Sequence, residues 1–180
     1  MSQINYNIIN NLMSKKNHIR GLAKDLKTNQ TTIARKIKGL TDDNIVDFKT
    51  EGKNKTYFIK NTIEAREYLL IVEHSELLNI IKKYPLLRST IETIKKEKSI
   101  KLAILFGSYA NLTVNKESDI DIYIETEDKK IKEKIQNINS KLSIKTGKYD
   151  RNNLLIKEIQ KKHIIIKGVE NYYEKNELFE

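Results

Sequence analysis

The sequence predicts an α+β protein in which a basic, helical N-terminal region precedes an α/β domain with a mixed sheet. Apolar residues in the first third recur at helical spacing, and short apolar runs beyond residue 100 read as strands separated by helices. The 180 residues suffice for two small domains. We expect a first domain at residues 1–60, a helical linker at 61–99 and a second domain at 100–180.

Composition excludes several classes of protein. The chain has no cysteine, which rules out disulfides and thiol catalysis. His18, His74 and His163 are isolated from one another, so we expect surface or packing roles rather than metal ligation. No apolar run approaches the roughly twenty residues of a membrane span, and the first residues lack signal-peptide character. We therefore expect a cytoplasmic protein without a membrane partner.

The net charge of +10 is unevenly distributed. Residues 1–60 contain 12 Lys and Arg against 5 Asp and Glu, whereas the remaining 120 residues contain 22 against 19. An A+T-rich genome would explain the abundance of lysine but not this skew. The skew favours a polyanionic partner for the first third.

The first third has the pattern of three helices followed by a hairpin. Expected helices lie at 5–14, Ile19–Leu26 and Thr31–Leu40, and expected strands at Ile45–Phe48 and Thr56–Ile59. Thr28 and Asn29 form a short break with capping chemistry, and Gly52 and Asn54 suit a hairpin tip. Two short helices across a tight turn, the second basic on its outer side, match a helix-turn-helix.

This region resembles the winged helix-turn-helix domains of archaeal and bacterial regulators, through residues 18–26 and 31–37. The resemblance implies binding of double-stranded DNA by a homodimer. Major-groove contacts would come from Asn29, Gln30, Thr31, Thr32 and Arg35, with Arg35 suited to guanine and Gln30 to adenine. Phosphate contacts would come from Lys36, Lys53 and Lys55. The alternative is a basic amphipathic helix that is merely solvated.

Residues 61–98 read as two helices, Asn61–Ile80 and a second around Pro85 that reaches Lys98. They carry more apolar residues than a free linker needs. These residues pack in a core of the same chain, between domains or against a second subunit.

An Asp-x-Asp motif in the second domain is the strongest chemical signal. An apolar strand at 101–106 leads to Gly107 and Ser108, and ten residues later Asp119 and Asp121 fall on one face of an expected strand. Backbone N–H groups and a hydroxyl at a Gly-Ser turn suit a phosphate, and paired carboxylates suit Mg²⁺. The alternative is the polar side of a half-buried sheet.

Gly-Ser followed after ten residues by Asp-x-Asp resembles the hallmark of the DNA polymerase β-like nucleotidyltransferase superfamily in its minimal, MNT form. The resemblance covers roughly residues 100–168. It implies that Gly107 and Ser108 hold the triphosphate of an NTP such as ATP, and that Asp119 and Asp121 are catalytic residues that bind Mg²⁺. In the family a third carboxylate on the next strand helps to activate the acceptor hydroxyl.

The third carboxylate is missing from the expected position. Residues 125–128 read as an exposed helix start. After a helix at 129–140, the next strand should be Lys141–Thr146, and its distance from the closing strand puts Ser143 where the family has an acid. Asp150 would substitute only if the strand continued past Gly147, which glycine disfavours. A further helix at 152–162, a strand at His163–Ile166 and a last helix from Val169 complete the domain.

Two functions follow. The first is a nucleotidyltransferase that moves NMP from NTP to a protein or other hydroxyl acceptor, since MNT-type antitoxins modify a partner HEPN-type toxin. The second is a winged-helix transcriptional regulator whose second domain is degenerate and only binds nucleotide or mediates assembly. The intact Gly-Ser and Asp-x-Asp favour the first, and Ser143 favours the second.

Overall fold

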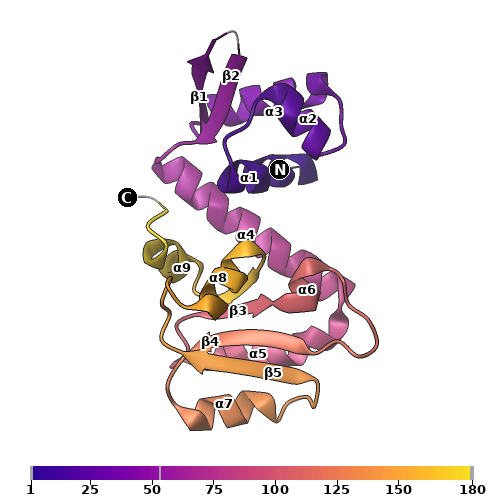
Figure 1. The fold of residues 1–180 in the computed structure, drawn as a ribbon, viewed down its shortest axis with the longest axis vertical. Coiled ribbons are helices and arrows are strands. Elements are labelled where there is room, and N and C mark those ends of the chain that lie inside the picture. Colours follow the sequence, from indigo (N-terminus) through magenta and orange to yellow (C-terminus); the bar gives the residue numbers. More distant parts are fainter. Residues whose placement is uncertain (1, 53, 179–180) are drawn as a thin grey trace. The chain divides into compact units, whose positions relative to one another are not determined.

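The computed structural model describes residues 2–52 and 54–178, which divide into two compact units (Figure 1). The division falls between Val72 and Glu73, inside a long helix, α4 (Ile63–Lys83). Each unit has its own buried apolar core. Among the described residues no helix has the length and hydropathy of a transmembrane segment.

The N-terminal unit contains three short helices, an antiparallel hairpin and the first part of α4. The elements are α1 (Gln3–Ser14), α2 (Ile19–Asp25), α3 (Gln30–Asp42), β1 (Val46–Glu51) and β2 (Asn54–Ile59). The helical stripes seen in the sequence form the core, in which Ile8, Ile9, Leu22, Ile33, Ile37 and Leu40 are buried. The strands are longer than predicted, and Asn54 is the first residue of β2 rather than part of the tip. Gly52 has a φ of +63°, as a tight turn requires.

A buried asparagine fastens the start of α2 to the hairpin. The Asn17 side chain accepts a hydrogen bond from the backbone N–H of His18 at 2.9 Å and donates to Asp25 at 3.1 Å. Its backbone forms a two-bond bridge with Tyr57 of β2, with N···O distances of 3.2 and 2.7 Å. Gly21 makes room for this side chain, because a Cβ there would lie 2.0 Å from Asn17 Oδ1. The α1–α2 connection is therefore fixed against β2.

The C-terminal unit is a four-stranded mixed sheet with helices on both faces. Its elements after α4 are a short 3₁₀ helix (Pro85–Leu87), α5 (Arg88–Lys96), β3 (Ala103–Phe106), α6 (Gly107–Asn111), β4 (Ile120–Glu125), α7 (Lys129–Gln136), β5 (Leu142–Gly147), α8 (Leu154–Lys161), β6 (Ile164–Lys167) and α9 (Val169–Lys175). The strand order is β5-β4-β3-β6, with β3 antiparallel to both neighbours and β4 parallel to β5. Each predicted strand is present, with its ends shifted.

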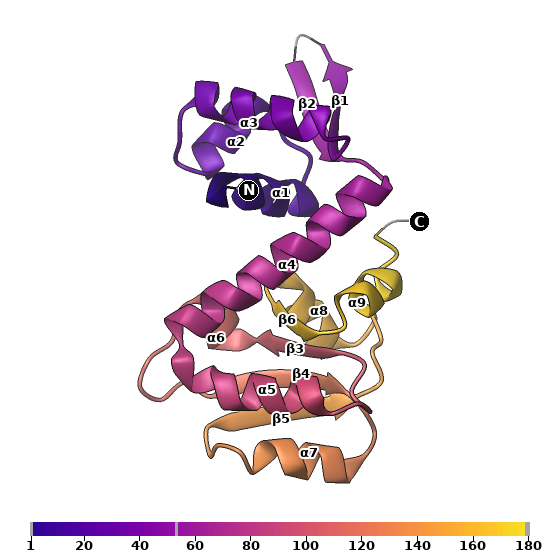
Figure 2. The ribbon, with the colours of Figure 1, turned by 180° about the vertical axis from the view of Figure 1, so that it is seen from behind.

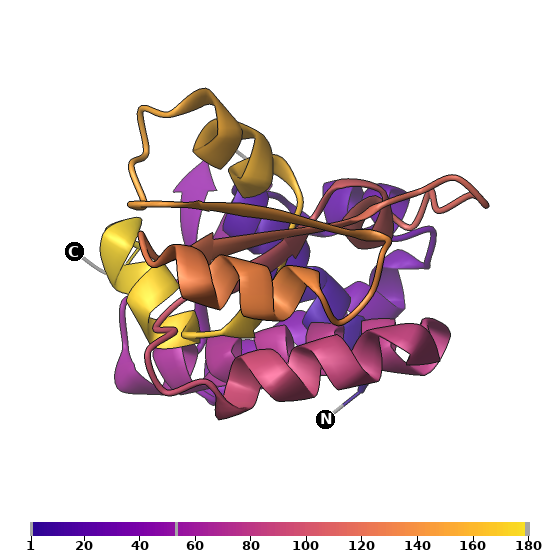
Figure 3. The same cartoon turned by 90° about the horizontal axis from the view of Figure 1, so that it is seen from below.

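The two faces of the sheet differ. One face joins α5, α7 and the end of α4 in a large apolar cluster that includes Ala103, Leu105, Ile120, Ile122, Ile124, Leu142, Ile144, Ile164 and Ile166. Figure 2 shows α5 lying across this face. The other face carries Asp121 and Tyr123 and is covered in part by α8, so that the sheet lies between α8 on one side and α5 and α7 on the other (Figure 3).

Apolar residues of the segment at 61–98 take part in the cores of the units to which they belong. Leu69 and Val72 are buried in the N-terminal unit, and Leu77 and Ile80 are buried in the C-terminal unit. Leu78, in contrast, is 57% exposed. The interpretation of this segment as part of the chain's own cores is confirmed for the buried residues.

Glu125 was expected at the exposed start of a helix, and this prediction is wrong. Glu125 is the last residue of β4, where its N–H donates to the Leu102 carbonyl at 3.0 Å and its carboxylate pairs with Lys175 at 2.9 Å. The helix begins instead after Asp128, whose side chain accepts a hydrogen bond from the Lys130 N–H at 2.8 Å. Pairing with Gly147 of β5 and the ion pair with Lys175 therefore keep Glu125 in the strand, although the residues around it are polar.

Candidate functional site

The Gly-Ser turn and the Asp-x-Asp motif meet where β3 ends and β4 begins. In the antiparallel register Phe106, the last residue of β3, is paired with Asp121 of β4. Gly107 follows Phe106 and begins α6 with a φ of +66°. A Cβ on Gly107 would lie 2.4 Å from Asp121 Oδ2, so only glycine permits this close approach. The loop after β3 therefore closes directly onto the Asp121 carboxylate.

Ser108 is the second residue of α6 and is half-buried. Its carbonyl accepts a hydrogen bond from the Thr113 N–H at 3.0 Å, which helps to turn the chain away after the short helix. Leu112 adopts a φ of +60° at this turn. Gly107 and Ser108 are thus held in a compact strand–turn–helix connection beside Asp121.

Asp119 lies just outside the strand on which it was expected. The first residue of β4 is Ile120, and Asp119 is exposed. The preceding residues form a polar turn, in which the Asn115 N–H donates to Ser118 Oγ at 2.9 Å and the Ser118 N–H donates to the Asn115 carbonyl at 3.2 Å. Because this turn competes with strand pairing, Asp119 stays outside β4. Of the two acids, only Asp121 has its side-chain direction fixed by the strand.

The position beside Asp121 on the next strand carries a hydroxyl. The parallel register of β4 and β5 pairs Asp121 with Ser143, the residue expected at the place of the third acid. Asp150 does not take the place of an acid there, because β5 ends at Gly147 and the Asp150 carboxylate accepts a hydrogen bond from the Asn152 N–H at 2.9 Å in the following loop. Lys145 shares the Ser143 face and is paired with Tyr123.

The donor set fits a magnesium ion that is shared with a substrate. No group of three or more His, Cys, Asp or Glu within the part of the chain described here could hold a metal ion by itself. Mg²⁺ commonly takes one or two carboxylates and completes its octahedron with water and substrate phosphates. Asp119 and Asp121 are oxygen donors of this kind, and the space kept free at Gly107 adjoins Asp121.

The residues expected to contact DNA lie on two elements of the N-terminal unit. Asn29 is the N-cap of α3, and its Oδ1 accepts a hydrogen bond from the Thr32 N–H at 2.7 Å, so this oxygen is already used. Gln30, Thr31 and Arg35 are exposed, whereas Thr32 and Lys36 are half-buried. Lys55 is exposed on β2, with its ammonium 3.9 Å from the centre of the Phe48 ring. Lys53 lies outside the described residues.

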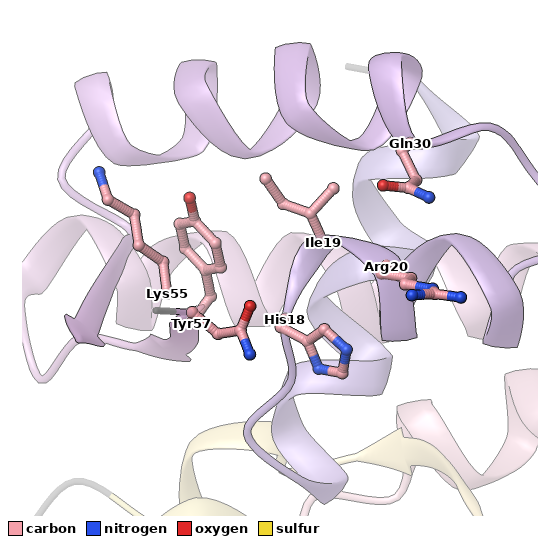
Figure 4. Close-up of a pocket in the computed structure, with 7 residues that line it drawn as sticks. His18, Ile19, Arg20, Gln30, Lys55 and Tyr57 are labelled. Carbon is pink, nitrogen blue, oxygen red and sulfur yellow. The ribbon is translucent and has the colours of Figure 1, made fainter. Parts of the chain in front are cut away.

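A pocket of about 420 Å³ joins some of these residues to others that sequence reasoning missed. It is lined by His18, Ile19, Arg20, Gln30, Asn54, Lys55 and Tyr57 (Figure 4). The sequence predicts a surface or packing role for His18 and no role for Arg20. The local sequence gives no signal for them, because residues 18–20 and 55–57 are far apart in the chain and meet in the tertiary structure, where a backbone bridge joins Asn17 to Tyr57.

Comparison with known proteins agrees with the fold of the C-terminal unit. Residues 88–177, half of the 180-residue chain, match the family model described as polymerase beta, nucleotidyltransferase. The match runs from α5 to α9 and contains the whole sheet, the Gly-Ser turn and both aspartates. A comparison with curated proteins found no match. The chain belongs to the polymerase β nucleotidyltransferase family.

Proposed function

We propose that the C-terminal unit is a Mg²⁺-dependent nucleotidyltransferase of the minimal, MNT type that transfers NMP from an NTP, such as ATP, to a hydroxyl acceptor. The contact between Gly107 and the Asp121 carboxylate carries the proposal, because it puts a phosphate-sized turn beside a metal-binding acid. Glycine at φ +66° leaves the Asp121 carboxylate free of a neighbouring side chain, as a site that receives a phosphate beside this acid requires.

Each residue has a distinct part in the proposed reaction. The N–H groups of the Gly107–Ser108 turn and the Ser108 hydroxyl bind the triphosphate. Asp119 and Asp121 hold Mg²⁺, which when bound neutralises developing charge on the phosphates. The acceptor oxygen forms a bond to the α-phosphorus, and the bond from that phosphorus to the bridging oxygen of pyrophosphate breaks. Ser143 adds no carboxylate to receive the acceptor proton, which is lost to water, so we expect slow transfer.

We propose a protein as the acceptor, with a HEPN-type toxin as the first candidate, which would make the chain an antitoxin. This part of the proposal rests on the resemblance to minimal nucleotidyltransferases. The alternative is a domain that binds nucleotide without transferring it, and the missing acid at Ser143 supports it.

Transfer of label from α-³²P-labelled NTPs tests the enzyme directly. The full chain is incubated with Mg²⁺, each of the four NTPs and a HEPN-type protein, and Asp121→Asn and Asp119→Asn are compared with Asp150→Asn. We expect label on the acceptor with the unchanged chain and with Asp150→Asn, and none with the other two variants. Absence of label with every NTP, combined with tight NTP binding, would support the alternative.

We propose a second function for the N-terminal unit, sequence-specific binding of double-stranded DNA by a homodimer with a winged helix-turn-helix. The exposed side chains of Gln30, Thr31 and Arg35 in the first part of α3 support it, together with the +7 charge of residues 1–60. Selection from a random duplex library would identify a site. Arg35→Gln should then lose affinity for that site by about tenfold or more, while Lys38→Gln, also exposed on α3, should relax no base preference.

A further inference from the structure

We propose that the pocket between α2, α3 and β2 receives the sugar–phosphate backbone of a nucleic acid strand, with Arg20 and Lys55 as its cationic contacts. The inference rests on the DNA-binding function proposed above and assigns a contact to Arg20, which lies outside the expected recognition residues. The lining comes from the two helices and the hairpin of one unit.

The charge of the pocket selects an anion. Its described lining consists of hydrogen-bond donors and apolar groups, namely His18, Ile19, Arg20, Gln30, Asn54, Lys55 and Tyr57, and includes no carboxylate. Asp25, an acid of the same unit, pairs with Lys15 at 2.9 Å. The described lining therefore carries positive charge from Arg20 and Lys55 and no carboxylate.

The arrangement of the charges favours a strand over a small anion. In Figure 4 the ends of Arg20 and Gln30 lie on one side of Ile19, and Lys55 and Tyr57 lie on the other. A single phosphate ion would be held by groups that converge on one point. Cationic groups at both ends of an apolar floor suit a polymer with charge at regular intervals.

The walls of the pocket are fixed before a ligand arrives. Asn17, which precedes His18 and is 8% exposed, is joined to Tyr57 by two backbone hydrogen bonds of 2.7 and 3.2 Å. Tyr57 is buried, and burial raises the pKa of its phenol, which therefore remains uncharged. The Lys55 ammonium lies 3.9 Å from the centre of the Phe48 ring, a contact that limits its motion. Little ordering is then needed on binding.

Salt dependence of binding to a labelled 20-base-pair duplex tests the proposal in the full chain. Arg20→Gln and Lys55→Gln are compared with Lys24→Gln, which removes the same charge from an exposed residue of α2 that does not line the pocket. The slope of log K against log salt should fall by about one unit in each pocket variant, and should hold its wild-type value in Lys24→Gln. Arg20→Lys should restore most of the slope. Amide correlation spectra of each variant check that the unit remains folded.

The outcomes separate this inference from the function on which it rests. If the unchanged chain binds duplex and all three glutamine variants share one slope, the pocket assignment is wrong and the DNA-binding function stands. If the unchanged chain binds no duplex, both are wrong. AMP and inorganic phosphate are titrated in parallel as small phosphate sources. Saturable binding of either one that Arg20→Gln abolishes, with the duplex slope unaltered, would overturn the assignment to a polymer.

Discussion

The Asp121 carboxylate occupies the space that a side chain at Gly107 would fill: a Cβ at Gly107 would lie 2.4 Å from Asp121 Oδ2. The contact follows from the pairing of Phe106 with Asp121, which brings the end of β3 beside the acid. It joins the turn expected to hold phosphate to the acid expected to hold metal.

Gly107→Ala should damage the site and cost stability. The new Cβ would overlap the Asp121 carboxylate, and a φ of +66° costs a residue other than glycine about 1–2 kcal/mol. ATP affinity measured by calorimetry in Mg²⁺ should fall sharply. Gly39→Ala is the matched control, because a Cβ there meets nothing within 4 Å inside α3, and it should stabilise by roughly 0.5–1 kcal/mol. Unaltered ATP affinity in Gly107→Ala would contradict the role of the contact.

Ser143→Asp should increase transferase activity. A carboxylate paired with Asp121 in the β4–β5 register would receive the acceptor proton and add a metal ligand, for a gain on the order of a hundredfold in kcat. KM for ATP should change little, because the phosphate turn is untouched. Lys145→Asp, which is two residues further along the same face, should give no such gain. Equal rates in the two variants would show that position 143 does not limit the reaction.

Glu73→Gln should make the protein more stable at high pH, because it removes a group whose ionisation lowers the stability of the folded chain. Burial raises the pKa of Glu73 to about 7, against the hydrogen bond that its carboxylate accepts from the Tyr173 hydroxyl at 2.8 Å. From pH 4.5 to about 7 the unfolded chain loses this proton and the folded chain keeps it, so stability falls as pH rises, by up to about 3 kcal/mol. Urea unfolding at pH 8 should show the variant to be more stable, whereas Glu174→Gln, at an exposed site on α9, should unfold like the unchanged chain.

His163 should make folding stability rise with pH, the opposite of the effect of Glu73, and His163→Asn should remove this contribution. Burial lowers the pKa of His163 to about 4, and its Nδ1–H donates to the Ile159 carbonyl at 3.0 Å. From pH 6.5 down to about 4 only the unfolded chain gains the proton, so stability falls as pH falls. His163 and Glu73 therefore offset each other in nearly the same window. Unfolding of His163→Asn should show a steeper decline with rising pH than unfolding of the unchanged chain, and parallel profiles would exclude this balance.

The sequence by itself located most elements and the chemical motif. Apolar spacing placed Ile33 and Ile37 on the buried side of α3, and alternation placed Ile122 and Ile124 in the sheet core, because burial acts on a periodic backbone. Gly107, Ser108, Asp119 and Asp121 were recognisable because their spacing is local. Local rules misplaced Glu125, since its strand position depends on pairing with Gly147 on β5.

Tertiary structure decided which residues meet. The contact of Gly107 with Asp121 and the place of Ser143 beside that acid depend on strand register, which links positions far apart in the chain. The pocket of Arg20 and Lys55 depends on a backbone bridge from Asn17 to Tyr57, and no pattern within either segment encodes it. Periodicity reports which side of an element is buried, whereas the partner across a sheet or pocket is fixed only when the whole chain packs.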